Sequence, residues 1–171
     1  MLDLAKRVRR RVEVTGIATD ADLRGMAAQV GLEVGSRPFP EPVKVVYARQ
    51  HLAITEGLDN AWERWAIAGG IAGVLLRSRA YVVTWPEPVA CLDLPADARR
   101  VLGLAGWIVV GDVLLTHRSL LDAQVLAAAA SLPPIATLRW LRLVGDTLRA
   151  QESWRNHRPK ADIVEGAGRI G

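Results

Sequence analysis

One segment, residues 62–76, constrains the fold more than any other, because it combines an apolar helical pattern with three central glycines. It reads WERWAIAGGIAGVLL and contains Gly69, Gly70 and Gly73. Each glycine inside a helix costs up to about 1 kcal/mol relative to alanine. Close packing of a neighbour against the narrow helix face can offset that cost. We expect a neighbouring helix to fill this space; the alternative is an open groove that binds a partner peptide.

Composition indicates one globular domain. The chain has 171 residues, of which 50% are apolar, 23% are charged and only 5% are aromatic. A core must therefore come mainly from small and aliphatic side chains, which favours packed helices. Neither an internal repeat nor a linker interrupts residues 1–150, whereas residues 151–171 are polar and rich in glycine. We predict a single domain over 1–150 and a flexible tail over 151–171.

Spacing of apolar residues predicts most of the elements. Helices are expected over residues 2–12, 20–30, 60–77, 99–110, 119–130 and 135–148. Thr19 and Asp22 have the spacing of a capping box, and Asp59 or Asn60 can cap the central helix. Short strands are expected over residues 32–34, 43–48, 52–55 and 81–85. The predicted class is α+β, mostly helical with a small mixed sheet.

Basic side chains are unevenly distributed although the net charge is only +4. One cluster lies in the first helix and comprises Lys6, Arg7, Arg9, Arg10 and Arg11. A second lies near the C-terminus and comprises Arg139, Arg142, Arg149, Arg155, Arg158 and Lys160. Such clusters can contact phosphates or acidic partners, or can simply form solvated helix faces. The sequence leaves both interpretations open.

Cysteine content and apolar runs indicate a cytoplasmic protein. The single cysteine, Cys91, excludes an intramolecular disulfide and fits a reducing compartment. No apolar segment of a signal peptide follows the basic N-terminus. The longest uncharged apolar run, residues 65–76, is much shorter than the roughly 20 residues that a membrane span needs. We therefore expect no membrane association.

The order of several segments resembles the ImmA/IrrE family of zinc metallopeptidases, over roughly residues 4–145. Residues 64–68 (RWAIA) are similar to the lead before the family's H-E-x-x-H motif, and residues 74–76 (VLL) to the run after it. Residues 104–110 (LAGWIVV) are similar to a later apolar helix, with Gly111 where the family has proline. Residues 119–148 look like the family's helix-turn-helix-like segment. The resemblance implies a zincin-like fold.

The same resemblance aligns Gly69, Gly70 and Gly73 with the motif's His, Glu and His. A zinc peptidase needs two histidines at i and i+4 to bind one metal, and a glutamate to take a proton from the bound water. Glycine supplies neither. The family's third ligand falls near Ala98, with Asp97 one residue away. We therefore expect no metal, no cofactor and no proteolysis.

Other catalytic sites have little support in the sequence. The other potential zinc ligands of the chain form no close pair in the sequence. They are His51, His117, His157 and Cys91. Ser119 and Asp122 lie near His117, yet no G-x-S-x-G motif accompanies them. We expect Ser119 to cap the helix that follows it.

Two functions remain. The resemblance implies a catalytically inactive binding protein, because family members act on helix-turn-helix repressors of phages and mobile elements. Such a prokaryotic regulator would hold a repressor or join a larger assembly. The alternative is DNA binding through residues 119–148. Against it, Ile135, Leu138, Leu141 and Val144 give the second helix of this segment an apolar face, which we expect to be buried.

The candidate binding surface lies on that second helix. Arg139 and Arg142 have i, i+3 spacing, and Arg149 follows seven residues later. Trp140, beside them, could stack on bases or serve packing. We name Arg139, Trp140, Arg142 and Arg149 as the candidate partner-binding or nucleic-acid-binding residues.

Overall fold

The computed structural model describes residues 1–84 and 96–156, which form a helix-rich α+β fold. The helices are α1 (Leu2–Arg11), α2 (Asp20–Gln29), α3 (Asn60–Leu76), α4 (Ala96–Val110), α5 (Val113–Thr116), the 3-10 helix η2 (Arg118–Leu121), α6 (Ala123–Ala130) and α7 (Pro134–Asn156). The strands are β1 (Glu33–Arg37), β2 (Val43–Ala48), β3 (His51–Thr55) and β4 (Tyr81–Thr84). The expected class, a helical majority with a small mixed sheet, is confirmed.

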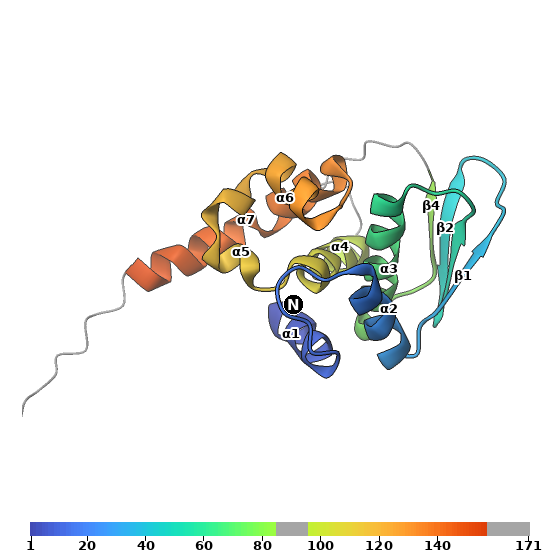
Figure 1. Ribbon diagram of the computed structural model, residues 1–171, viewed down its shortest axis with the longest axis horizontal. Coiled ribbons are helices and arrows are strands. Elements are labelled where there is room, and N and C mark those ends of the chain that lie inside the picture. Colours follow the sequence, from blue (N-terminus) through green and yellow to red (C-terminus); the bar gives the residue numbers. More distant parts are fainter. Residues whose placement is uncertain (85–95, 157–171) are drawn as a thin grey trace, which may run out of the picture.

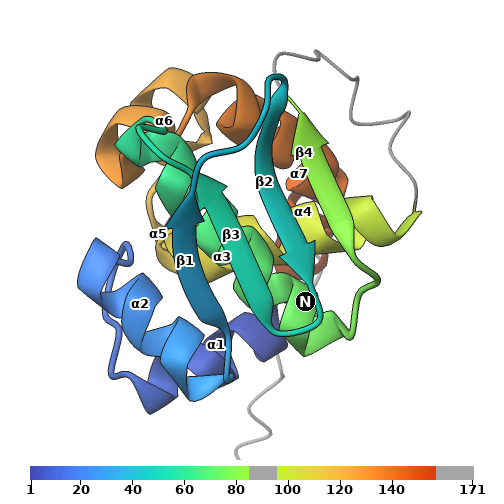
Figure 2. The same ribbon diagram turned by 90° about the vertical axis from the view of Figure 1, so that its right-hand side faces the viewer.

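The four strands form one sheet in the order β1-β3-β2-β4. β1 runs parallel to β3, whereas β2 is antiparallel to both β3 and β4. Helices α2 and α3 lie against one face, and the opposite face has no described helix over it (Figures 1 and 2). Side chains alternate along β2, so Val45 and Tyr47 point into the core.

Behind the sheet, α3 and α4 pack against each other and form the centre of the core (Figure 1). Every residue of α4 from Gly103 to Val110 is buried. This burial explains why the segment is almost purely apolar. Among the described helices, none has the length and apolar character required to cross a membrane.

Arg9 of α1 caps the buried C-terminal end of α4. Its guanidinium donates to the carbonyl oxygens of Ile108 (2.6 Å), Val109 (3.0 Å) and Gly16. The last carbonyls of a helix lack intrahelical partners, so this arginine replaces the water that burial excludes. Burial lowers the pKa of Arg9, and Asp112 and Asp22 oppose that shift. Gly111 leaves room for the guanidinium, since an added Cβ would lie 2.7 Å from Arg9 Cζ.

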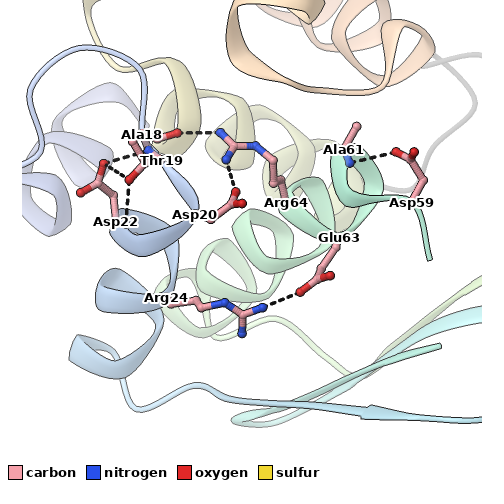
Figure 3. Close-up of polar contacts among 9 residues, drawn as sticks. All are labelled: Ala18, Thr19, Asp20, Asp22, Arg24, Asp59, Ala61, Glu63 and Arg64. Atoms are coloured by element: carbon pink, nitrogen blue, oxygen red, sulfur yellow. Dashed lines mark hydrogen bonds and ion pairs between the residues drawn. The ribbon is translucent and has the colours of Figure 1, made fainter. Parts of the chain in front are cut away.

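A second buried arginine, Arg64, ties α3 to the start of α2 (Figure 3). It pairs with Asp20 and donates to the carbonyl oxygen of Ala18 at 2.6 Å. On the exposed side of the same helices, Arg24 pairs with Glu63 at 2.6 Å. Arg64 precedes the glycines of α3, and these contacts show that its role in the fold is to join two helices.

Local signals for helix ends were largely correct. Thr19 and Asp22 form the expected capping box, and the Asp59 carboxylate accepts from Ala61 N at 2.9 Å (Figure 3). The expected cap at Ser119 was wrong, because a 3-10 turn occupies residues 118–121 and Asp122 caps α6 instead. The last helix was predicted too short, since α7 continues past residue 148 to Asn156. The remaining expected tail, 157–171, lies outside the described residues.

Strand predictions differed from the structure mainly at the edges. The 43–48 strand is confirmed, and its expected neighbour begins one residue earlier, at His51. The first strand was predicted too short, because its parallel pairing with β3 extends to Arg37. That pairing joins segments distant in sequence, so local propensity carries little information about where it ends.

Candidate functional site

The three glycines of α3 do not line an open groove. An added Cβ at Gly70 would lie 2.9 Å from Leu32 Cδ2 and 3.0 Å from Leu52 Cδ2. At Gly73 it would lie 2.9 Å from Tyr47 Cζ. The expected neighbour was a helix, and this expectation was wrong at both positions, because side chains of the sheet and of Leu32, just before β1, fill the space. Packing around Gly69 is looser, since the atom nearest to an added Cβ would be the Tyr81 hydroxyl at 3.4 Å.

Two tyrosines occupy the space beside these glycines. Tyr47 and Tyr81 face each other across β2 and β4, with ring centroids 4.8 Å apart and planes 21° apart. Burial raises the pKa of both phenols, and the neighbouring Tyr47 raises that of Tyr81 further. Both rings therefore remain neutral at physiological pH and act as packing groups.

Within the described part of the chain, no three His, Cys, Asp or Glu side chains come together as metal ligands could. His51 lies 2.8 Å from the carboxylate of Glu33, and both side chains are exposed. His117 contacts the Thr116 hydroxyl at 2.8 Å. Cys91 and His157 lie outside the described residues. The Asp122 carboxylate, which is near His117 in sequence, accepts hydrogen bonds from Gln124 N and Val125 N and so caps α6.

Trp140 cannot belong to a contact surface, because it is completely buried. Its indole Nε1 donates to the Gly103 carbonyl oxygen at 3.0 Å. The ring also meets Trp107 edge to face, with centroids 5.2 Å apart. Of the two interpretations of Trp140, the structure supports packing, and it does so by docking α7 onto α4.

The three arginines named with Trp140 differ in exposure. Arg142 is exposed, whereas Arg139 is only partly exposed. Arg149 lies on α7, but its side chain is outside the described part of the structure. In the N-terminal basic cluster, Arg9 was wrongly grouped with surface charges, because it is buried against α4. Arg7, Arg10 and Arg11 are exposed, as a solvated helix face requires.

An apolar groove of about 770 Å³ lies between α6 and α7. Its lining consists of Leu121, Asp122, Ala123, Gln124, Pro134, Ile135, Leu138, Leu141, Arg142 and Gly145. Leu121, Ile135 and Leu138 are 46%, 45% and 36% exposed, which is high for large aliphatic side chains. We refer to this feature as the α6–α7 groove.

The α6–α7 groove exists because α7 has two apolar faces. Ala136, Trp140 and Val144 follow an i, i+4 spacing and are buried in the core. Ile135 and Leu138 lie on another face and remain exposed. The expectation that Ile135, Leu138, Leu141 and Val144 share one buried face was therefore wrong. Two interleaved apolar patterns along residues 135–144 were the sequence signal that could have revealed the groove.

Charge in the α6–α7 groove is asymmetric. Arg142 is the positively charged residue of the lining, and its side chain is exposed. Asp122 supplies the negative charge, but its Oδ1 is already engaged by two backbone N–H groups of α6. An acidic side chain entering the groove would thus find its best partner at Arg142.

Comparison with family models, with curated proteins and with solved structures finds no significant match for this chain.

Proposed function

We propose that the protein is a non-catalytic binding protein that holds an amphipathic helix of a protein partner in the α6–α7 groove. The observation that carries the proposal is the exposed apolar lining formed by Leu121, Ile135 and Leu138. Isolated exposed leucines are common, but several that converge on one groove are typical of helix-in-groove recognition. The resemblance to the ImmA/IrrE family supports a regulatory partner, such as a helix-turn-helix repressor.

The chemistry of the groove defines the partner more closely. Apolar side chains at i, i+3 or i+4 on the bound helix would cover Ile135 and Leu138. An Asp or Glu on the same helix would reach Arg142, the exposed cation of the lining. We expect the apolar contacts to supply most of the affinity and the ion pair to favour one orientation of the helix.

Absence of proteolysis is part of the proposal. Gly69, Gly70 and Gly73 offer neither a metal ligand nor a general base, and Tyr47 and Leu52 pack where such side chains would extend. We infer the degenerate zincin-like fold from the order of the sequence segments.

DNA binding is supported less well than protein binding. The first turns of α7 present Ile135 and Leu138 to solvent. A recognition helix reads base edges with hydrogen-bonding side chains near its N-terminal end, and neither residue has a donor or acceptor. Arg142 lies further along the helix and could contact phosphate, but it would carry no sequence information.

A photo-crosslinking experiment in the native cell tests the proposal. A photoreactive residue at position 135 should capture one protein partner. Leu138→Glu should weaken capture at least tenfold, because a carboxylate would be buried against apolar surface. Val125→Glu is the matched control: Val125 is 47% exposed on α6 but outside the groove lining, so capture should be unchanged.

Two outcomes would contradict this function. Equal capture by Leu138→Glu and Val125→Glu would show that the groove is not the binding surface. Loss of binding after nuclease treatment, with affinity that falls steeply as salt rises, would instead indicate DNA binding.

A further inference from the structure

A second, smaller cavity of about 120 Å³ lies where the end of α3 meets the first turns of α4. Its lining consists of Leu76, Arg77, Ser78, Arg79, Asp97 and Arg100. A single water needs roughly 10–15 Å³ on a comparable measure, so a tetrahedral oxyanion fits with solvent to spare. This cavity is distant in sequence from the α6–α7 groove and does not depend on the function proposed for it.

Positive charge dominates this cavity. Arg77, Arg79 and Arg100 are all exposed, and Asp97 contributes the opposing charge. Among the described residues, no hydrogen bond or ion pair engages any of the three guanidinium groups. Three like charges that share a cavity repel one another, and an anion between them would remove that repulsion.

The helix dipole favours a cation at the position of only one of the three arginines. Arg77 follows the C-terminus of α3, where the helix dipole favours a cation. It adopts a left-handed conformation with φ of 52°, and the turn is closed by Ser78 N donating to Gly73 O at 2.8 Å. Arg100 lies near the opposite kind of helix end, the N-terminus of α4, where the dipole does not favour a cation. Arg79 lies in neither helix.

We propose that this cavity binds a phosphate group through Arg77, Arg79 and Arg100. The guanidinium fork matches an oxyanion with two parallel hydrogen bonds, and several arginines around one cavity are the usual means of recognising phosphate. Asp97 refines the ligand chemistry, because its carboxylate can accept a hydrogen bond from a protonated phosphate oxygen. Sulfate has no such proton at neutral pH, so the cavity should select phosphate over sulfate. The phosphate is either free or the terminal group of a small phosphomonoester.

Calorimetric titration of the full chain at constant ionic strength tests this assignment. Inorganic phosphate should bind saturably, and sulfate should bind more weakly. Arg79→Glu and Arg100→Glu should each reduce phosphate affinity at least tenfold, because each removes a charged hydrogen-bond donor. Arg10→Glu, an equal charge change at an exposed position of α1, should leave the affinity unchanged.

Two further titrations sharpen the result. Asp97→Asn should strengthen sulfate binding and so reduce the selectivity, which a purely structural Asp97 would not do. Glycerol 3-phosphate distinguishes the source: tighter binding than inorganic phosphate indicates a phosphomonoester, and equal binding indicates free phosphate. Absence of saturable phosphate binding, or an equal loss in Arg10→Glu, would overturn the proposal.

Discussion

Gly69 and Gly73 lie one helical turn apart in α3, yet an added methyl group would meet very different surroundings. At Gly69 the nearest atom is the Tyr81 hydroxyl at 3.4 Å, an ordinary contact. At Gly73 two atoms of the Tyr47 ring lie within 3.1 Å. Tyr47 is buried and stacked on Tyr81, so its ring cannot move independently. The two glycines are therefore packed differently, although the sequence alone gives no sign of the difference.

This difference predicts opposite effects of alanine on stability. Gly69→Ala should raise the free energy of unfolding by up to about 1 kcal/mol, because alanine favours the helix. Gly73→Ala should lower it by about 1 kcal/mol, since overpacking against Tyr47 outweighs the same helix gain. Urea denaturation of both variants measures the difference. A Gly73→Ala protein as stable as Gly69→Ala would show that the tyrosine pair is not rigid.

At the scale of single elements, α4 depends on a side chain from another helix. Its C-terminal carbonyls are buried, and Arg9 satisfies those of Ile108 and Val109. Arg9→Met should lower the free energy of unfolding by about 2 kcal/mol, because the buried Ile108 carbonyl oxygen would lose its donor, whereas Val109 O would keep the one from Ala18 N at 2.8 Å. Arg10→Met, at the adjacent exposed position, should change it by less than about 0.5 kcal/mol. Thermal and denaturant unfolding measure both variants. An equal loss of stability in Arg9→Met and Arg10→Met would contradict the capping role of Arg9.

The helix α7 shows what an element-level pattern can and cannot predict. Its apolar periodicity predicted a helix correctly, and its two apolar stripes follow from the spacing of Ile135, Leu138, Trp140 and Val144. Which stripe is buried depends on the partner surface. Gly106 on α4 leaves the space for the Trp140 ring, and the Gly103 carbonyl oxygen accepts its indole hydrogen, so the stripe that contains this tryptophan enters the core. The other stripe is left to form the α6–α7 groove.

For the whole molecule, the contact of Trp140 with α4 joins the C-terminal helices to the central core. A Cβ at Gly106 would overlap the buried indole of Trp140. Gly106→Ala should therefore cost about 3 kcal/mol or more and detach α7, which limited proteolysis should detect as early cleavage within α6 and α7.

Gly103→Ala is the control for this prediction on the same helix. The Cβ at Gly103 would lie 3.0 Å from Met1 Sδ, and Met1 is 55% exposed and free to move. The free energy of unfolding of Gly103→Ala should equal that of the wild type or exceed it by up to about 1 kcal/mol, because alanine favours the helix, and its proteolysis pattern should be unchanged. If Gly106→Ala behaved in the same way, α7 would not depend on close approach at Trp140.

Sequence alone determined the helical majority, most helix ends and the strand at Val43–Ala48, because capping and periodicity act over a few neighbouring residues. It also predicted that the glycines of α3 would receive a close neighbour, since an unpacked helix with three glycines would be unstable. Only the tertiary structure decided that sheet side chains fill that space, that Trp140 and Arg9 are buried, and that Ile135 and Leu138 are not. These outcomes depend on contacts between residues far apart in the chain, and local patterns do not encode which surface meets which.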